Sequence, residues 1–283
     1  MPHALVLQSD FGYEDGAVSA MKGVAHSVSR LLPIYDNTHE IPVFDIWAGS
    51  YRLWQTVMYW PAETIFVSVV DPGVGSERRS IVAKTKDNQY IVTPDNGTLT
   101  HLSQKVGIVS VREIDETKHR LPNSGISHTF HGRDIYAYTG AKLASSIMLF
   151  EDVGPEVNLE DVELLPFQEA TLSEEEITGM IDILDIRFGN LWTNISYELF
   201  MKLNIQYMDK LVVKIFHGSR LIYENNVSYG KSFGAIHVGE PVLYINSLHN
   251  LAIAINQGSF AKAYDIGTGT NWKIQIGKLA SPE

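Results

Sequence analysis

The chain of 283 residues contains no cysteine. This absence excludes a disulfide framework, thiolate metal sites and a cysteine nucleophile. Its 22 glycines and 11 prolines follow no fixed period, which excludes collagen-like and low-complexity classes. Because 45% of the residues are hydrophobic and only 19% are charged, the chain has enough apolar side chains to bury a substantial core.

Long apolar runs are also missing from the sequence. No stretch approaches the roughly 20 apolar residues that a helix needs to span a bilayer. The first residues, MPHALVLQSDFGYEDG, lack a positive patch followed by an apolar stretch. We therefore expect a soluble, cytoplasmic protein with no signal peptide and no membrane partner.

Basic residues are the minority, with 22 Lys and Arg against 33 Asp and Glu, which gives a net charge of −11. This balance argues against a nucleic-acid partner held by phosphate contacts. Ten of the acidic residues lie between Glu151 and Glu176, where no Lys or Arg occurs. We interpret this segment as a solvated connector, so its charge gives little information about the ligand.

The chain length suggests two domains of roughly 150 residues each. We place an N-terminal α/β domain at 1–158, an acidic linker at 159–176 and a C-terminal β domain at 177–283. In the first part, strand-like runs such as Ala4–Gln8 alternate with helical patterns such as Asp15–Arg30. This alternation predicts a mainly parallel sheet covered by helices on both faces.

Aspartates follow the strand-like runs of the first domain, where ligands bind in parallel α/β sheets. They are Asp10, Asp36, Asp71 and Asp95. The second domain has a different texture, with short β-type runs separated by Gly, Asn and Ser turns. That spacing predicts a small all-β barrel or sandwich.

The densest signal for a site is VVDPGVGSERR, at Val69–Arg79. Pro72, Gly73 and Gly75 form a tight loop after a strand, but the loop lacks the pattern of a Walker loop or a dinucleotide fingerprint. Three interpretations stay open at this point: an anion-binding nest, an Asp71–Arg78 pair that orients a reactant, or a turn with a surface salt bridge.

A second signal is SHTFHGRD, which contains His128 and His131. The two histidines could bind a metal together with Asp10, Asp71 or Asp95, which would suit a metal-dependent phosphohydrolase. We favour His131 as a neutral base or water-orienting group, because Gly132 leaves open space beside it. A structural histidine is the remaining alternative.

The second domain contributes acids and amides near turns. Asp185 and Asn190 flank a Phe-Gly turn, and Asn246 and Ser247 follow a strand-like run. A carboxylate and neighbouring amides can bind an amine and the edge of a heterocycle. Taken together, the motifs of both domains favour a ligand with an amine, sugar hydroxyls and a base.

Several of these motifs, taken in order along the chain, resemble those of the S-adenosyl-L-methionine (SAM) hydroxide adenosyltransferases, relatives of the fluorinase and chlorinase enzymes. They are Ser9–Gly12, Val69–Arg79, Pro94–Gly97, Phe130–Asp134, Asp185–Asn190 and Asn246–Ser247. The resemblance covers nearly the whole chain and implies an α/β domain followed by a barrel-like β domain. It further implies a homotrimer with the ligand between neighbouring subunits, and hydrolysis of SAM to adenosine and L-methionine.

The resemblance also implies roles for individual residues. Asp71, Arg78 and His131 would hold the attacking water, without a metal or cofactor. Substrate would be bound by residues with separate tasks: Asp10 at the ribose hydroxyls, Asp15 and Asp185 at the methionine amine, Asn190 at the adenine edge and Ser247 at the carboxylate.

Two positions bear on the kind of chemistry. The halogenating relatives have a Tyr where Asp71 stands, and a carboxylate there would repel a halide, so Asp71 disfavours a halide-using adenosyl transferase. They also have an Arg where this chain has Leu248. Besides the metal-dependent phosphohydrolase and the halide-using adenosyl transferase, a nucleoside-binding module without catalytic activity is a third alternative.

Overall fold

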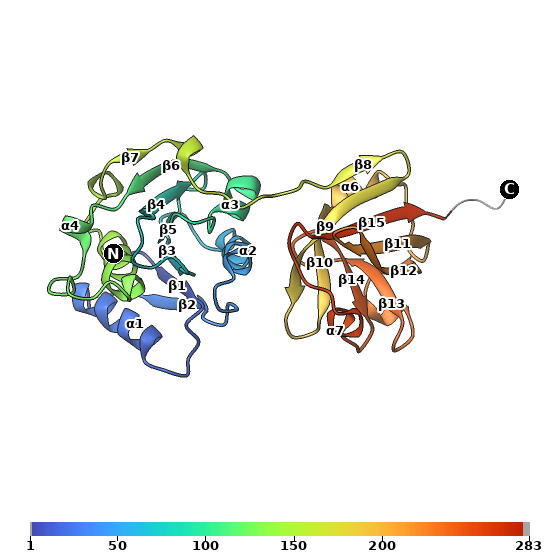
Figure 1. Ribbon diagram of the computed structural model, residues 1–283, viewed down its shortest axis with the longest axis horizontal. Helices are drawn as coiled ribbons and strands as arrows, with labels where there is room; N and C mark the ends of the chain where they lie inside the picture. Colours follow the sequence, from blue (N-terminus) through green and yellow to red (C-terminus); the bar gives the residue numbers. More distant parts are fainter. Residues whose placement is uncertain (1, 280–283) are drawn as a thin grey trace. The chain divides into compact units, whose positions relative to one another are not determined.

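The computed structural model describes residues 2–279, which form two compact units, the first extending to Leu165 and the second beginning at Pro166 (Figure 1). The first unit is a mixed α/β fold and the second is all-β apart from short helices. The predicted fold class is therefore confirmed.

A seven-stranded sheet in the order β2-β1-β3-β5-β4-β6-β7 forms the centre of the first unit. Its strands are β1 (Leu5–Ser9), β2 (Ile34–Thr38), β3 (Ile65–Val69), β4 (Ser80–Thr85), β5 (Tyr90–Pro94), β6 (Ile108–Glu113) and β7 (Glu156–Val157). Strands β2, β1, β3 and β5 are parallel, whereas β4, β6 and β7 pair antiparallel. The antiparallel pairing of β4, β6 and β7 extends the mainly parallel sheet that the sequence predicts.

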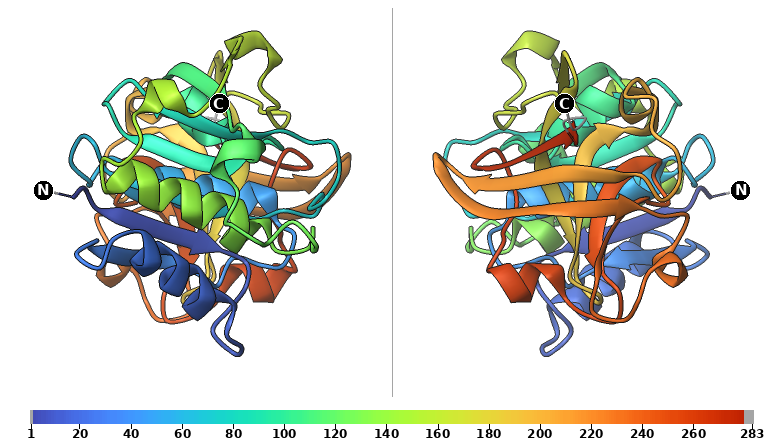
Figure 2. Two further views of the ribbon diagram at one scale, coloured as in Figure 1. Left: turned by 90° about the vertical axis from the view of Figure 1, so that its left-hand side faces the viewer. Right: turned by 90° about the vertical axis from the view of Figure 1, so that its right-hand side faces the viewer.

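Helices cover both faces of this sheet. They are α1 (Ala17–Val28), α2 (Ile46–Val57), α3 (Thr100–Lys105), α4 (Glu116–His119), the π-helix η1 (Gly132–Ala137), α5 (Tyr138–Ala144) and the 3₁₀ turns η2 (Phe150–Asp152) and η3 (Leu159–Asp161). Helix α1 packs on η1 and α5 at one face, while α2 and α3 pack together at the other (Figure 2). Val18, Met21 and Ala25 of α1 are buried because their helical spacing places them on one side.

The second unit is a closed seven-stranded barrel in the order β10-β14-β13-β12-β11-β15-β9, with β9 pairing back to β10 and β8 added outside β9. Its strands are β8 (Thr171–Ser173), β9 (Glu176–Asp185), β10 (Asn190–Ser196), β11 (Lys210–His217), β12 (Arg220–Tyr229), β13 (Pro241–Ile245), β14 (Asn250–Ile255) and β15 (Trp272–Lys278). Short helices lie between them: α6 (Tyr197–Met201), η4 (Phe233–Ala235) and α7 (Phe260–Tyr264).

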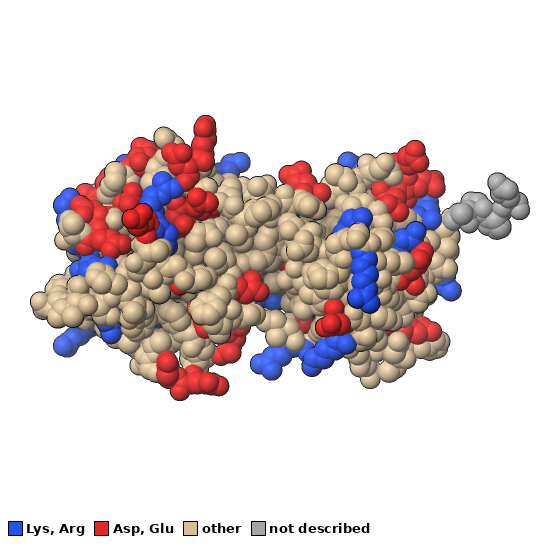
Figure 3. Space-filling model, viewed as in Figure 1, with Lys and Arg blue, Asp and Glu red and all other residues tan. Residues whose placement is uncertain are grey.

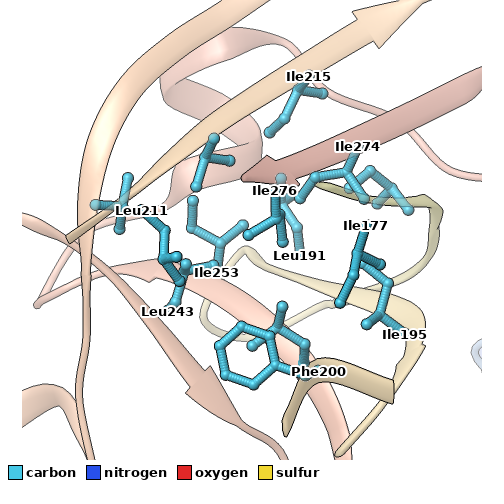
Figure 4. Close-up of a cluster of buried hydrophobic side chains, with 14 of the residues drawn as sticks. Ile177, Leu191, Ile195, Phe200, Leu211, Ile215, Leu243, Ile253, Ile274 and Ile276 are labelled. Atoms are coloured by element: carbon cyan, nitrogen blue, oxygen red, sulfur yellow. The ribbon is translucent and has the colours of Figure 1, made fainter. Parts of the chain in front are cut away.

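The interior of the barrel is filled by aliphatic and aromatic side chains. Val213 and Ile215 are buried at alternate positions of β11. Phe200 of α6 is fully buried in the same cluster as Ile177 and Ile195 (Figure 4). Alternation of this kind places every second side chain in the core. Closure of the sheet leaves no free edge within the barrel, so the loops at its ends can vary around a rigid wall.

The segment 159–176, predicted as a linker, contains ordered structure at both ends. Residues 159–165 belong to the first unit, where η3 lies and where Leu165 N donates to Thr100 Oγ1 (2.8 Å). Strand β8 then pairs with β9 of the barrel. Acidic side chains gather over the end of the first unit that contains β6, β7 and α4 (Figure 3). None of the helices in residues 2–279 has the length and apolar character needed to cross a membrane.

Candidate active site

The loop between β3 and β4 brings Asp71 and Arg78 together. Asp71 stands two residues after the end of β3, and Arg78 stands two residues before the start of β4. The turns of the loop close it: Val74 N donates to the Asp71 carbonyl (3.2 Å) and Gly75 has a φ of +79°, which favours glycine. The polar loop therefore sits at the carboxyl end of a buried parallel strand, as the sequence predicts.

Arg78 binds Asp71 through two parallel contacts, Nε to Oδ1 (2.9 Å) and Nη2 to Oδ2. The side chains are only 10% and 5% exposed, which rules out the surface salt bridge as an interpretation of this loop. A bidentate guanidinium–carboxylate pair combines charge with fixed geometry. The predicted Asp71–Arg78 pair is therefore present and buried.

His131 reaches the same cluster from the N-terminal end of η1. Its Nδ1 lies 3.0 Å from Arg78 Nη2, and its Nε2 lies 3.3 Å from Arg120 Nη2. Burial, followed by the charge of Arg78, lowers the pKa of His131 below its usual value near 6.5. The imidazole is therefore neutral at physiological pH.

The space beside Gly132 differs from the prediction. A Cβ at Gly132 would lie 3.0 Å from the ring of Phe11, so the glycine admits an aromatic side chain instead of leaving an open space. Phe11 also packs edge-to-face with Phe130, with ring centroids 5.7 Å apart. Phe11, the residue after Asp10, thus contacts the N-terminal end of η1, where His131 lies.

Four further residues surround the cluster: Ser80, Glu116, Arg120 and Tyr136. None of them was predicted from the sequence. Ser80 Oγ accepts from Arg78 Nη1 (3.1 Å), contacts Tyr136 OH (3.2 Å) and donates to Glu116 Oε1 (3.1 Å). Arg120 Nη2 donates to Glu116 Oε2 (2.8 Å). The i,i+4 spacing of Glu116 and Arg120 is visible in the sequence, but nothing there links the pair to His131.

Asp10 follows β1, the parallel neighbour of β3, and Ser9 is paired with Val69. The Asp10 and Asp71 loops therefore leave the same edge of the sheet. Asp10 Oδ2 accepts from Phe44 N (2.9 Å). Asp15 is more peripheral: it is exposed and accepts from Ala17 N (2.8 Å) at the start of α1.

A hydrogen-bond network that runs from the interior to the exposed Asp36 supports the Asp10 loop. Ser9 Oγ lies 2.7 Å from His39 Nδ1, and His39 Nε2 lies 3.2 Å from Asp36 Oδ1. Although the order Ser–His–Asp resembles a hydrolase triad, Ser9 and His39 are fully buried, so the hydroxyl has no access to a substrate. Burial lowers the pKa of His39, and the network supports the turn that follows β1.

The aspartate after β5 has a structural role. Asp95 Oδ2 accepts from Arg79 Nε (2.8 Å) and Oδ1 accepts from Glu163 N (2.9 Å), so both oxygens are occupied.

His128 and His131 lie with their ring centroids 6.4 Å apart, and the edge of one ring points toward the face of the other. Within residues 2–279, no three His, Asp or Glu side chains are grouped so that they could hold a metal ion. The ligand set considered for a metal-dependent phosphohydrolase does not assemble.

In the second unit, Asp185, Asn190 and Ser247 line one cavity of about 930 Å³. Asp185 ends β9 and Asn190 begins β10, and the two side chains lie 3.5 Å apart across the hairpin. Gly189 in this turn has a φ of +69°, and a Cβ there would collide with Ser259. The tight turn therefore requires glycine and fixes the position of both polar side chains.

Aromatic side chains form much of the cavity wall: Phe188, Trp192, Phe233 and Tyr244. Trp192 Nε1 donates to Tyr244 OH (3.2 Å), and burial raises the pKa of Tyr244 to about 12. Asn246 Oδ1 accepts from Leu248 N (2.9 Å) and Asn250 N (3.0 Å), which shapes the turn that presents Ser247. Flat apolar walls with a few polar groups suit a heterocycle.

The two units match the two domains of one protein family. Residues 5–154 match the SAM hydroxide adenosyltransferase N-terminal domain, and residues 179–273 match its C-terminal domain. The chain belongs to the SAM hydroxide adenosyltransferase family. The fold and the family predicted from the motifs are both confirmed.

Curated members of this family include hydrolases and halogenating enzymes. The chain is 36% identical to an (R)-S-adenosyl-L-methionine hydrolase of Methanocaldococcus jannaschii, over 75% of this chain and 73% of the relative. It is 30% identical to the hydrolase of that name from Salinispora tropica, over 95% and 96%. It is 28% identical to a fluorinase of an Actinoplanes species, over 94% and 95%.

A solved structure shares the whole fold. The crystal structure of an uncharacterized conserved protein from Thermotoga maritima superposes with a TM-score of 0.86 at 33% identity, covering 97% of this chain and all of that chain. Both units of this chain therefore share the fold of this solved structure.

The buried pair Asp71–Arg78 gives the first testable prediction. Arg78→Met should destabilise the protein by about 3–5 kcal/mol, because it leaves the Asp71 carboxylate buried without its partner. Asp71→Asn should cost a similar amount, whereas the double variant should cost clearly less than the sum of the two. Urea denaturation of the four proteins measures this coupling. Additive losses would show that the pair is not coupled.

Proposed function

We propose that this chain hydrolyses S-adenosyl-L-methionine to adenosine and L-methionine. The observation that supports this best is the cluster in which the buried Asp71–Arg78 pair meets the buried His131, at the loop that follows the parallel strand β3. Membership of a family whose curated relatives include SAM hydrolases identifies the substrate class.

The reaction does not require a general acid. The oxygen of water attacks the 5′ carbon, the bond from that carbon to sulfur breaks, and its electron pair goes to sulfur. Sulfur leaves as a neutral thioether, so it needs no proton, and one proton of the water is released. The main requirement is a water molecule held in line with the carbon–sulfur bond.

The cluster provides such a holder for water. Asp71 accepts a hydrogen bond from the water and draws charge toward its oxygen. Arg78 fixes the orientation of Asp71 and favours partial hydroxide character electrostatically. His131, whose pKa is lowered by burial and by Arg78, orients the water as a neutral ring. No metal or organic cofactor enters this scheme.

Substrate recognition is assigned to the residues predicted from the resemblance. Asp10 binds the ribose hydroxyls, Asp15 and Asp185 bind the methionine amine, and Asn190 binds the adenine edge. Ser247 binds the methionine carboxylate together with backbone N–H groups, because Leu248 has no charge to offer. The aromatic walls of the cavity around Asn190 support its assignment to the base.

Product analysis tests this function directly. Incubation with SAM in ¹⁸O-labelled water should yield adenosine and methionine in equal amounts, with the label in the 5′ hydroxyl of adenosine because water attacks that carbon. Mass spectrometry measures the label.

The same assay separates the alternatives. Turnover that is lost with a chelator would indicate the metal-dependent phosphohydrolase, and a 5′-halogenated nucleoside formed in added chloride or fluoride would indicate a halide-using transferase. Adenosine binding without product, even in a single turnover with excess enzyme, would indicate a binding module.

Variants test the roles of the two central residues. Asp71→Asn and His131→Gln should each lower turnover by about 10²- to 10⁴-fold, the usual range for groups that position or accept a proton. Adenosine binding should change little, because neither residue is assigned to the nucleoside. Calorimetry measures the binding and chromatography the rate.

Asp95→Asn is the matched control for these variants. It removes the charge of a neighbouring buried aspartate that also pairs with an arginine but lies outside the cluster. It should retain turnover within a few-fold. Wild-type rates in both Asp71→Asn and His131→Gln would contradict the assigned roles.

The oligomeric state is a further part of the proposal. The resemblance implies a homotrimer with sites between neighbouring subunits, and we infer that each site uses Asp71 of one subunit and Asn190 of the next. Coexpression of Asp71→Asn with Asn190→Ala chains should then restore about a quarter of the wild-type activity, the statistical share of intact sites. Light scattering gives the mass of the assembly. No recovery in mixed assemblies would contradict shared sites.

A further inference from the structure

We propose that Arg120, held in place by Glu116, is a positioning residue that keeps His131 uncharged. This inference rests on the proposed function of the cluster and goes beyond it by adding a second arginine to the site. Its basis is geometric: Arg78 Nη2 lies 3.0 Å from one ring nitrogen of His131, and Arg120 Nη2 lies 3.3 Å from the other.

Only one of the two guanidinium groups can form a hydrogen bond with the neutral imidazole of His131. A guanidinium can only donate, and a neutral imidazole has one accepting nitrogen and one N–H group. One contact is therefore a hydrogen bond, and the other brings two donors together. A protonated ring would accept from neither arginine and would add a third positive charge between them. Arg78 and Arg120 therefore form a clamp on His131 that opposes its protonation.

Glu116 fixes both arginines. Its Oε2 accepts from Arg120 (2.8 Å), four residues further along the chain at the end of α4. Its Oε1 accepts from Ser80, whose oxygen accepts in turn from Arg78. The remaining lone pair of Ser80 faces the buried Tyr136 hydroxyl, which burial keeps protonated by raising its pKa, so every site on the Ser80 hydroxyl is used.

The position of Arg120 costs stability, which argues against a purely structural role. Its side chain is 16% exposed, and its Nη1 is buried without a hydrogen-bond partner within residues 2–279. A buried donor without a partner is destabilising. A residue kept at such a cost next to the central histidine is consistent with a task at that histidine.

Within residues 2–279, the charged or titratable groups that interact with His131 belong to three segments. Asp71 and Arg78 come from the β3–β4 loop, Glu116 comes from α4 with Arg120 directly after it, and His128 comes from the loop before η1. Tyr136 of η1 contacts Arg78 and Ser80. Burial and then Arg78 lower the pKa of His131; Arg120 acts in the same direction, whereas Glu116 and Asp71 act in the opposite one. Removing Arg120 and removing Glu116 should therefore have opposite effects.

The role of His131 in the reaction follows from this arrangement. A ring that resists protonation does not store the proton that hydrolysis releases. It serves as a fixed hydrogen-bonding partner for the water, and the proton passes to the solvent. Glu116 and Arg78 both line a cavity of about 520 Å³.

The test measures the titration of His131 itself. Histidine is labelled with ¹³C at Cε1, and His131→Gln identifies the resonance by its loss. Relative to the wild type, Arg120→Met should raise the pH midpoint of His131 by about one unit, and Glu116→Gln should lower it, as expected for single charges at these distances. Arg120→Gln is the second choice if Arg120→Met does not fold.

Lys118→Met is the matched control, because it removes a cation from α4 that pairs with Asp115 and is 72% exposed. It should leave the midpoint unchanged. In parallel, the acid limb of kcat/KM for SAM should move up in Arg120→Met and down in Glu116→Gln, which general loss of structure would not produce.

The titration does not depend on turnover, so it separates this inference from the proposed function. Opposite shifts in a protein without hydrolase activity would support the clamp and refute the proposed reaction. Shifts in one direction for both variants, or an unmoved midpoint in Arg120→Met, would overturn the role of Arg120 even if SAM is hydrolysed.

Discussion

The bidentate ion pair between Arg78 and Asp71 is the contact on which the arrangement of the site depends. Burying two charges is costly, and the cost is offset only when the remaining hydrogen-bonding groups are also satisfied. Arg78 meets this condition because four of its five N–H groups are directed at Asp71, Ser80 and His131. The guanidinium thus joins the end of β3, the start of β4 and the start of η1 in one fixed geometry.

The charges around His131 are balanced in a way that suits its chemistry. Two arginines and two carboxylates surround the ring, each arginine in contact with one carboxylate. The cluster therefore has little net charge while His131 is neutral, and it would gain a positive charge if the ring were protonated. Because the proposed substrate is a sulfonium cation, a neutral cluster is the better environment for its approach.

Much of this arrangement could be predicted from sequence, and the limits have physical reasons. Short-range patterns identified the strand ends at Asp10 and Asp71, because an acid directly after an apolar run is a local feature. They could not show that Ser80 joins Arg78 to Glu116, since that contact depends on antiparallel pairing of β4 with β6. The aromatic cavity was missed for a similar reason: Trp192 and Tyr244 lie on separate strands and look like ordinary core residues.

The same geometry explains why water rather than a halide suits this cluster. A halide at the water position would face the Asp71 carboxylate, and two like charges 4 Å apart repel by about 4 kcal/mol at the effective dielectric of a protein site. Arg78 offsets this only in part, because its donors are already directed at Asp71, Ser80 and His131 and one N–H remains. Water has no charge to repel and can donate to Asp71, so in the proposed reaction the carboxylate that disfavours a halide is also the group that holds the neutral nucleophile.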